Sequence, residues 1–498
     1  MMDSKLHIAM FPWLAFGHFI PFLQLANDLA KRGHRISLLL PTNALLKLKH
    51  MNLHPQLITF CSLNLPPGVE TTADTNNNLD GSLEVAFDGL RDEVKTILVQ
   101  MEKPNLVFYD LAYWIPELVL EMGCKTVRFT VVSPTISALS LAMWAIKGKG
   151  RAVTAADLME GFPCDSKVVL REHEAYQVSR FANAPSNRIK VFDRVGEALK
   201  RCDAIAMRAC NEMEGHYCNY IGTKLGKRVY CTGPLLPEQP REEEPLDDEI
   251  ARWLENFEPN SVIFCVFGSE VTLAKEQFQE LVLGLELTGL PFLVAIRPPE
   301  GSCSIEEALP EGFQERVKGK AIVRGGWVQQ SMILRHKAVG YFVNHGGSAS
   351  MWESLASHCR IILAPANRFD FALNARLMAE ELEAAVEVQT DENGRFFKEN
   401  LCNAIKSVMG ESRQKENHKK WRDLLLNHDF ADNYIQNFIH NLFTEQQFLK
   451  GLKLLWDHGI KKVVIECDAK RVVDWISADI GSDIPNGNVA NIINECKC

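Results

Sequence analysis

The sequence predicts an α/β protein made of two doubly wound, Rossmann-like domains that face each other across a cleft. The first observation is that short apolar strand candidates alternate with amphipathic helix candidates from the start, as in HIAMFPW, PFLQLANDLAKRG and RISLLLPT. The second is that a proline-rich, acidic stretch, PLLPEQPREEEP, interrupts this alternation, since it favours neither helix nor strand. The third is that the alternation then starts again. Such alternation is typical of a parallel sheet with helices on both faces.

The other elements follow the same pattern. In the first half, NLVFYDLAYWIPELVLEMG predicts a strand and a helix, and KTVRFTVV predicts another strand. Residues 129–146 are uncharged but include a proline and several Ser and Thr residues, so we expect strand, turn and buried helix there rather than a membrane span. The second half offers strands in SVIFCVFGSE, PFLVAIRP, KAVGYFVNHGG and RIILAPA, a helix in KEQFQELVLGLELTG, and a helix and strand in LNARLMAEELEAAVEV. Ligands of such sheets bind outside the carboxyl ends of the strands.

The composition narrows the class of partner. The 498 residues include 54 Lys and Arg and 63 Asp and Glu, which gives a net charge of -9 without a basic block. Because nucleic acids and anionic lipids attract basic surfaces, we expect neither as a partner and predict a small molecule instead. The 14 cysteines are scattered, mostly in apolar runs, which fits a reducing, cytoplasmic compartment. Cys210, His216 and Cys218 lack a second pair of ligands at suitable spacing, so we predict no metal site.

The segment YFVNHGGSASMWESL, residues 341–355, runs from a predicted strand into a predicted helix through small residues. Gly346 and Gly347 permit close approach of the backbone, and the free N–H groups at the start of a helix, together with its dipole, form an anion site. A diphosphate would suit this site, and His345 could donate to it.

Two neighbouring side chains would complete a nucleotide site. Trp327 offers a flat face for a base, and Glu353 can accept hydrogen bonds from two ribose hydroxyls. Each residue also has an ordinary structural explanation: Ser350 and Glu353 match a capping box, Trp327 could belong to the core, and His345 could be a strand-end histidine with its hydrogen bonds satisfied. The joint spacing favours the nucleotide site.

A candidate general base lies in FPWLAFGHFIP. His18 follows Gly17 at the predicted start of a helix after the first strand, where its side chain would point into the cleft. A hydroxyl nucleophile needs a base within hydrogen-bond reach. A carboxylate that orients the imidazole and offsets its acquired charge improves such a base. Asp110 follows the strand NLVFY. The structural alternative is that each of the two residues caps a helix.

The stretch from Trp327 to Asn374 resembles the nucleotide-sugar signature of the plant family 1 glycosyltransferases, which opens with W-x-x-Q and continues through H-C-G-W-N-S and E to a D/E-Q pair. In that family the Trp stacks on uracil, the Glu holds the ribose, and the His, Gly and Ser positions bind the diphosphate of a UDP-sugar. In this chain FGSE supplies a further diphosphate position. The resemblance implies UDP-sugar-binding roles for Ser269, Trp327, Val328, Gln330, His345, Gly347, Ser348, Ser350, Glu353 and Asp370. It also implies that His18 and Asp110 match the catalytic base of the family and its partner.

Several positions depart from the family pattern. Gly346 and Ser348 replace the Cys and the Trp or Phe of the signature, and Ala349 replaces its Asn. The segment ANRFDF is one residue longer than usual, so Asp370 keeps the sugar-binding position only if the extra residue loops out. Phe371 replaces the Gln that follows. Sugar recognition is therefore the part of the resemblance that these changes affect most.

The resemblance extends from about His7 to Leu442 and implies a GT-B fold. The predicted domains are an N-terminal acceptor-binding domain at residues 1–233 and a C-terminal UDP-sugar-binding domain at residues 247–426, joined by a linker at residues 234–246. A helix at residues 427–442 is predicted to cross back to the first domain.

The implied activity is an inverting transfer of a sugar from a UDP-sugar to a small-molecule hydroxyl. No metal or cofactor is expected besides the UDP-sugar co-substrate, and the protein is expected to be a cytoplasmic monomer. MWESL, FYDLAYWIPEL and LPPGVETT are similar to the subgroup that adds a second sugar to flavonoid or terpenoid glycosides. Alternatives are a terpenoid or saponin glycoside acceptor and a non-catalytic protein that binds nucleotide sugars or glycosides.

The C-terminal residues 443–498 have a different character. GLKLLWDHGIKKVVIECDAKRVVDWI resembles the middle of a ribonuclease H-like domain of plant retroelements, in which Asp468 would be a metal-binding carboxylate. A two-metal nuclease needs several carboxylates from different elements. The strands that would supply the others are absent from this sequence, so we expect a truncated, nonfunctional tail.

Overall fold

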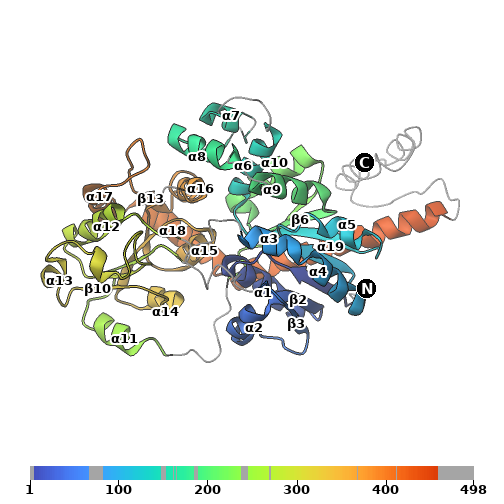
Figure 1. Cartoon of the computed structure of the whole chain (residues 1–498), viewed down its shortest axis with the longest axis horizontal. Coiled ribbons are helices and arrows are strands. Elements are labelled where there is room, and N and C mark those ends of the chain that lie inside the picture. Colours follow the sequence, from blue (N-terminus) through green and yellow to red (C-terminus); the bar gives the residue numbers. More distant parts are fainter. Residues whose placement is uncertain are drawn as a thin grey trace.

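The computed structural model describes residues 5–66, 82–146, 153–160, 162–163, 165–183, 189–236, 245–268, 271–366, 368–410 and 412–457. Its described part contains two parallel sheets, each covered by helices (Figure 1). The first sheet has the strand order β3-β2-β1-β4-β5-β6-β7. Its strands are β1 (His7–Phe11), β2 (Arg35–Pro41), β3 (Ile58–Leu63), β4 (Leu106–Tyr109), β5 (Lys125–Thr130), β6 (Ala204–Met207) and β7 (Val229–Cys231).

The helices of the first half connect successive parallel strands, as in a doubly wound sheet. They are α1 (Phe16–Lys31), α2 (Thr42–Leu48), η1 (Lys49–Met51), α3 (Ser82–Gly89), α4 (Arg91–Gln100), α5 (Ile115–Leu120), α6 (Pro134–Ala145), α7 (Ala155–Met159), α8 (Glu172–Asn183), α9 (Val191–Arg201) and α10 (Asn211–Leu225).

The second sheet has the strand order β10-β9-β8-β11-β12-β13. Its strands are β8 (Val262–Val266), β9 (Phe292–Ala295), β10 (Ala321–Arg324), β11 (Val339–Asn344), β12 (Arg360–Leu363) and β13 (Ala385–Glu387). Its helices are α11 (Asp248–Leu254), α12 (Lys275–Leu287), η3 (Glu306–Ala308), α13 (Phe313–Arg316), α14 (Gln330–Arg335), α15 (Ser348–Ala356), α16 (Phe369–Arg376), η4 (Leu377–Glu381), α17 (Lys398–Ser407) and α18 (Arg413–Leu425). The two-domain α/β prediction is confirmed.

The strands form where the sequence offers short, continuous apolar runs. All residues of β1, β8 and β11 are buried, as expected for parallel strands that have helices on both faces. Residues 134–143 of α6 are also all buried, which explains why this helix has no polar face. The expectation of strand, turn and buried helix for residues 129–146 is confirmed. Among the described residues, none of the helices combines the length and the apolar character that a bilayer-spanning helix requires.

The last described helix, α19 (His428–Asp457), packs on the first half of the chain, and Figure 1 shows it running along that half. The ring centre of Phe438 lies 6.2 Å from that of Phe108 and 6.1 Å from that of Tyr230. Residue 442 was predicted to end this helix, but α19 continues through it without interruption to Asp457. The other predicted domain boundaries stay predictions. Residues 237–244 of the linker and 458–498 of the tail lie outside the described residues.

The carboxyl ends of both sheets meet at one interface. Ser133, just after β5, donates from Oγ to Oδ1 of Asn374 in α16 at 2.9 Å. Arg208, just after β6, has its guanidinium 5.5 Å from the ring centre of Trp352 in α15. The helices α15 and α16 follow β11 and β12 respectively, so the side of each sheet where ligands are expected faces the other half.

Candidate active site

His18 and Asp110 come together at the carboxyl edge of the first sheet. β1 and β4 are parallel neighbours with Phe11 opposite Tyr109, so the turn before His18 and the residue after Tyr109 lie side by side. Nδ1 of His18 is 2.5 Å from Oδ2 of Asp110. The His18 side chain is 20% exposed and that of Asp110 is 3% exposed. The Asp110 bond occupies Nδ1, and Nε2 is the nitrogen that can meet a ligand.

The structural alternative for these two residues is wrong. The N-cap of α1 is Ala15 and that of α5 is Trp114, and neither end has a side-chain cap hydrogen bond. His18 is the third residue of α1, and Asp110 uses its carboxylate on His18. The pairing therefore requires another explanation than helix capping.

Arg128 forms a hydrogen bond with the backbone of Asp110 and was not predicted as a site residue from the sequence. Its Nε donates to the backbone oxygen of Asp110 at 3.3 Å and its Nη1 to Oγ1 of Thr130 at 2.6 Å. Burial lowers the pKa of Arg128, and the Asp110 charge opposes that effect. The two hydrogen bonds fix the backbone at Asp110. The signal in the sequence was an arginine inside the predicted strand KTVRFTVV, flanked by Val127 and Phe129.

In the predicted nucleotide site, Trp327 and Val328 differ in their exposure to solvent. Trp327 is 83% exposed, so the alternative that it belongs to the core is wrong, and its ring face is available to a ligand. Val328, the next residue, is buried in the core beneath β8 and β11. The buried neighbour therefore fixes the backbone position of Trp327.

Gln330 and Glu353 contact each other. Nε2 of Gln330, the first residue of α14, donates to Oε2 of Glu353. Burial raises the pKa of Glu353, while the Gln330 hydrogen bond and the positive charge of Arg208 oppose this effect. The capping-box alternative is wrong, because α15 begins at Ser348 with Gly347 as an N-cap that has no side-chain hydrogen bond. Glu353 lies in the second turn and its carboxylate is free of any capping role.

The predicted anion site lies between β11 and α15. His345 is buried, and its Nδ1 has no hydrogen-bond partner within the described ranges. Burial, helped by the charge of Arg368, lowers the pKa of His345 to about 3. His345 is therefore neutral at physiological pH and can offer an N–H but not a positive charge. A Cβ on Gly347 would lie 2.5 Å from Nε2 of His345, so only glycine fits there.

Gly346 packs closely against Phe371 at the start of α16. Gly346 has φ of +85°, and a Cβ on it would lie 2.8 Å from the backbone oxygen of Phe371. The ring centre of Phe371 is 4.6 Å from that of His345. Asn374 then fixes the turn by donating to the backbone oxygen of Gly346 at 2.8 Å. The glycine in place of the family's Cys fits this close approach.

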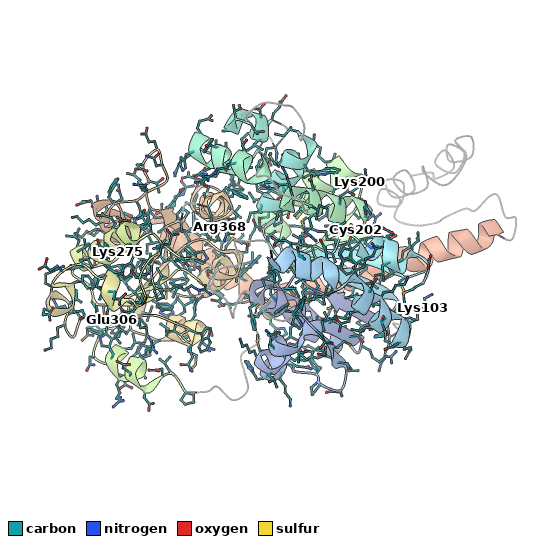
Figure 2. The ribbon with its side chains drawn as sticks, viewed as in Figure 1. Lys103, Lys200, Cys202, Lys275, Glu306 and Arg368 are labelled. Atoms are coloured by element: carbon teal, nitrogen blue, oxygen red, sulfur yellow. The ribbon has the colours of Figure 1, made fainter. Side chains whose placement is uncertain are left out.

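The predicted sugar-binding acid is already paired. Nη2 of Arg368 donates to Oδ2 of Asp370 at 2.7 Å and Nε to Oδ1 at 3.1 Å. The same guanidinium lies 4.2 Å from the ring centre of Phe371. Figure 2 shows Arg368 on the part of the second half that lies closest to the first. A donor sugar would meet an ion pair here rather than a single carboxylate.

Three serines were also predicted to bind the UDP-sugar. Ser348 Oγ lies 3.4 Å from Nδ2 of Asn374, and Ser350 is buried within α15. Ser269 lies outside the described residues. Arg208 and Asn374 were not predicted as site residues, but they connect this site with the first half. Arg208 contacts Trp352 across the interface, and Asn374 accepts a hydrogen bond from Ser133.

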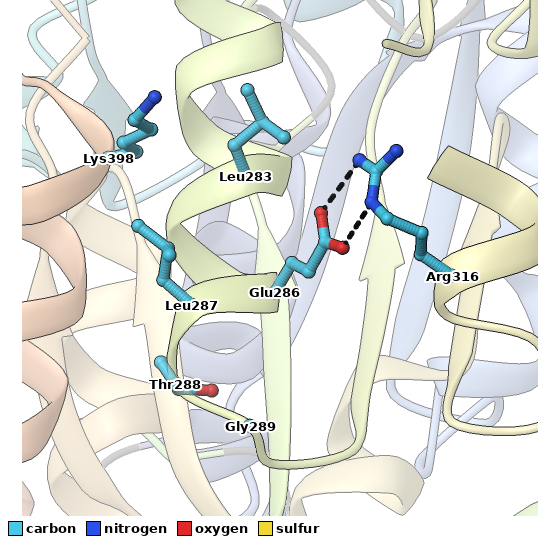
Figure 3. Close-up of a pocket in the computed structure, with 7 residues that line it drawn as sticks. All are labelled: Leu283, Glu286, Leu287, Thr288, Gly289, Arg316 and Lys398. Atoms are coloured by element: carbon cyan, nitrogen blue, oxygen red, sulfur yellow. Dashed lines mark hydrogen bonds and ion pairs between the residues drawn. The ribbon is translucent and has the colours of Figure 1, made fainter. Parts of the chain in front are cut away.

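A pocket elsewhere in the second half does not belong to this site (Figure 3). Its lining residues are Leu283, Glu286, Leu287, Thr288, Gly289, Arg316 and Lys398. Residues 287–289 lead into the amino end of β9, which is the opposite edge of the sheet from the His345 turn. The described parts of the chain contain no group of three or more His, Cys, Asp or Glu side chains placed to hold a metal ion.

Comparisons with known proteins agree with this geometry. The model of the family "UDP-glucoronosyl and UDP-glucosyl transferase" matches residues 240–429. The chain is 48% identical over 457 residues to anthocyanidin 3-O-glucoside 2'''-O-xylosyltransferase of Arabidopsis thaliana, covering 88% of this chain and 97% of that one. The chain belongs to this family of UDP-glycosyltransferases. A second relative, UDP-glycosyltransferase 79B6 of Arabidopsis thaliana, is 44% identical, with 89% of this chain and 98% of the relative covered.

Solved structures show that this UDP-glycosyltransferase has the GT-B fold. A Glycyrrhiza uralensis UGT73P12 complex matches with a TM-score of 0.74 at 18% identity, covering 92% of this chain and 100% of that one. An Arabidopsis thaliana UGT89C1 complex with UDP-L-rhamnose matches with a TM-score of 0.68 at 21% identity, covering 88% of this chain and 99% of that one. The predictions of fold and enzyme class are confirmed.

The C-terminal part of this glycosyltransferase matches a second family model, "Reverse transcriptase-like", over residues 435–497. The predicted resemblance to a ribonuclease H-like fragment is confirmed. The match begins inside α19, upstream of the boundary predicted at residue 442.

Proposed function

We propose that this protein transfers a sugar from a UDP-sugar, with inversion at the anomeric carbon, to a hydroxyl on the sugar of a flavonoid glycoside. The observation that carries the proposal is the 2.5 Å contact between Nδ1 of His18 and Oδ2 of Asp110 at the ligand-binding edge of the first sheet. The 48% identical relative is named for adding xylose to an anthocyanidin 3-O-glucoside, which supports an acceptor that already carries a sugar.

In the proposed reaction His18 is the general base. Its Nδ1–H donates to Asp110, so the lone pair of Nε2 takes the proton of the acceptor hydroxyl. The hydroxyl oxygen then bonds to the anomeric carbon as the bond from that carbon to UDP breaks. Asp110 offsets the charge that the imidazole acquires, and Arg128 holds Asp110 in place.

The leaving diphosphate would lie at the N-terminus of α15. The backbone N–H groups there and the helix dipole favour a developing negative charge. His345, neutral because burial lowers its pKa to about 3, would donate a hydrogen bond to the same group. The exposed ring of Trp327 would stack on uracil, and Glu353 would accept from the ribose.

The identity of the donor sugar depends on the region around Asp370. Its ion pair with Arg368 and the neighbouring Phe371 leave fewer hydrogen-bonding groups for sugar hydroxyls than the family signature has. UDP-xylose, UDP-glucose and UDP-rhamnose are therefore all candidates. The reaction as proposed uses no metal, and the protein is proposed to act as a cytoplasmic monomer.

Two other functions compete with this one: transfer to a terpenoid or saponin glycoside, and binding of nucleotide sugars or glycosides without catalysis. A protein that only binds needs no oriented base, so the His18–Asp110 geometry favours an enzyme.

UDP release from the three donors with flavonoid glycosides, their aglycones and saponins tests the proposal, with proton NMR of the product to establish inversion and a chelator to establish metal independence. We expect release only with a glycoside acceptor. UDP binding without transfer to any acceptor would establish the non-catalytic function instead, and transfer to saponins alone would change the acceptor class.

A further inference from the structure

An ion pair near the proposed base has no role in the reaction described so far. Arg194 of α9 donates from Nη1 to Oδ1 of Asp88 in α3 at 2.8 Å and from Nη2 to Oδ2 at 2.6 Å. Arg194 is 1% exposed, whereas the Asp88 side chain is 33% exposed. A buried guanidinium thus holds a carboxylate that stays accessible to solvent. Such two-pronged pairs fix both position and orientation.

Aromatic rings surround this ion pair. The guanidinium carbon of Arg194 lies 5.2 Å from the ring centre of Tyr113, 5.8 Å from that of Phe87 and 5.9 Å from that of Trp13. These are cation–π distances. Phe87 is fully buried, but Trp13 and Tyr113 are only partly buried. Their rings therefore offer apolar surface to a ligand beside an accessible carboxylate.

The cluster adjoins the base. Arg194 Nη1 lies 3.4 Å from the backbone oxygen of Leu111, the residue that follows Asp110. Trp13 lies in the turn between β1 and α1, and His18 is the third residue of that helix. A ligand held by the cluster would therefore lie next to the imidazole.

The same helix also reaches the donor side. Phe192, two residues before Arg194 in α9, has its ring centre 6.0 Å from that of Phe369 in α16. Phe369 precedes Asp370, the residue that the family resemblance assigns to the donor sugar. The N-terminal end of α9 thus lies between the base and the predicted donor site, where a second sugar ring would have to be held for a sugar-on-sugar transfer.

We propose that Asp88, Arg194, Trp13 and Tyr113 form the subsite for the sugar of the glycoside acceptor. This inference rests on the proposed function. Oδ1 of Asp88 also accepts from Nε1 of Trp114 at 3.1 Å, so Oδ2 is the oxygen that would accept a hydrogen bond from a sugar hydroxyl. The rings would contact the apolar face of the sugar, since ligand sites combine aromatic walls with a few placed polar groups. Arg194 is buried, so its part in the subsite is to hold the Asp88 carboxylate in position.

An ion pair of this kind could instead only fasten α3 to α9. The two roles differ in what they change. A subsite sets the affinity for the sugar-bearing acceptor and leaves the aglycone and the UDP-sugar unaffected. A fastening role changes stability and affects all substrates equally.

The experiment compares steady-state kinetics of Asp88→Asn and Trp13→Leu with wild type, using a flavonoid 3-O-glucoside and the UDP-sugar, and it compares binding of the glucoside and of its aglycone by calorimetry. We expect the KM for the glucoside to rise about 10- to 100-fold in Asp88→Asn, the usual effect of losing hydrogen bonds to a charged group. The KM for the UDP-sugar should change by less than about threefold. Trp13→Leu keeps the ion pair and should also raise the KM for the glucoside.

The matched control is Glu197→Gln, which breaks the 2.8 Å pair between Glu197 and Arg201 further along α9 and should leave every KM unchanged. Calorimetry of the glucoside with UDP-saturated protein separates the two proposals, because it needs no turnover. Glucoside binding that both variants weaken supports the subsite even if transfer is never observed. Unchanged binding in Trp13→Leu, equal losses for glucoside and aglycone, or no binding by wild type would overturn the subsite.

Discussion

At the scale of single residues, the site depends on side chains that have one defined partner each. His18 is bound through Nδ1 to a carboxylate that is 3% exposed, so its ring cannot rotate without leaving that carboxylate unpaired. Glu353 is bound by Gln330 and faces Arg208, which keeps its carboxylate in place before any ligand arrives. Preorganised groups of this kind are what transfer reactions require.

Replacing His18 by alanine should reduce transfer by about 10²- to 10⁴-fold, the usual contribution of a general base. UDP affinity should stay within a factor of about two, because His18 is the proposed base for the acceptor and the proposed UDP site lies in the other half. Rate assays beside calorimetry with UDP measure both quantities. Asp110→Asn should keep the hydrogen bond but lower the rate and alter its pH profile. Unimpaired turnover in His18→Ala would exclude it as the base.

Replacing Glu353 by glutamine should weaken UDP binding by about 1 to 1.5 kcal/mol, because a charge-assisted hydrogen bond to the ribose becomes a neutral one. The helix should not lose stability, since Glu353 has no capping role in α15. Calorimetry with UDP and thermal unfolding provide the two measurements. Equal UDP affinity in Glu353→Gln and wild type would remove Glu353 from the donor site.

At the scale of secondary-structure elements, helices from the two halves interlock through charged groups. Arg376 at the end of α16 donates from Nη1 to Oε2 of Glu174 in α8 at 2.7 Å, and the two side chains are 6% and 4% exposed. Glu381 in η4 contacts His216 and Tyr217 of α10. These contacts set how the acceptor and donor sides face each other.

Glu174→Gln should destabilise the protein by about 3 to 5 kcal/mol, because it leaves the buried charge of Arg376 without its main partner. Glu387, 3.5 Å from Nη2 of Arg376, will offset part of this loss. Urea unfolding gives the free energy directly. The exposed pair of Arg91 and Glu117 serves as control, since Glu117→Gln should cost less than about 1 kcal/mol. Similar costs for both variants would show that the buried pair does not hold the halves together.

The His216–Glu381 contact predicts a pH dependence. The carboxylate of Glu381, 3.3 Å from Nε2, raises the pKa of His216 above 6.5 despite burial. Burial alone would raise the pKa of Glu381, but the interactions with His216 and Tyr217 outweigh it and lower that pKa. The contribution of His216 is therefore complete below its unfolded pKa and is lost as pH rises through its folded pKa. The contribution of Glu381 is lost as pH falls below its ordinary range.

Melting temperatures of wild type and His216→Gln at about pH 5.5 and about pH 8.5 test this dependence. Wild type should exceed the variant at the lower pH, and the difference should shrink at the higher pH. A difference of equal size at both values would show that His216 contributes through packing alone.

At the scale of the whole molecule, α19 joins the end of the transferase to its beginning. Its buried anchors are Ile435, Phe438, Ile439 and Leu442, which pack with the core of the first half. Arg32 in α1 also contacts Asp432 at 2.8 Å. The helix therefore contributes to the core well before the residues of the tail begin.

Truncation after residue 442 or after residue 457 should leave activity and melting temperature close to those of the full chain, because both products keep the four anchors. Truncation after residue 434 removes Phe438 with the other anchors and should cost more than about 3 kcal/mol, the usual loss for one buried Phe. Thermal unfolding and the transfer assay compare the three products. A large loss in the product ending at residue 457 would show that the tail packs on the enzyme.

The sequence alone predicted the two-domain α/β organisation, because short apolar runs that alternate with amphipathic helices predict parallel strands. Its resemblance to the glycosyltransferase family selected the stretch from Trp327 to Asn374 and the pair of His18 and Asp110. The structure then showed that β1 and β4 are neighbours, which brings these two side chains together. The ribonuclease H-like character of the tail was also readable from local sequence.

Only the tertiary structure decided which partners the charged groups take. Glu353 looked equally suited to a helix cap, and its Gln330 contact depends on how α14 packs beside α15. Asp370 pairs with Arg368, two residues before it, and no periodicity predicts this ion pair. Asp88 and Arg194 are 106 residues apart and meet because α3 and α9 pack at the same edge of the sheet. Contacts between elements that are distant in the sequence depend on how those elements pack, and a local sequence pattern does not specify that packing.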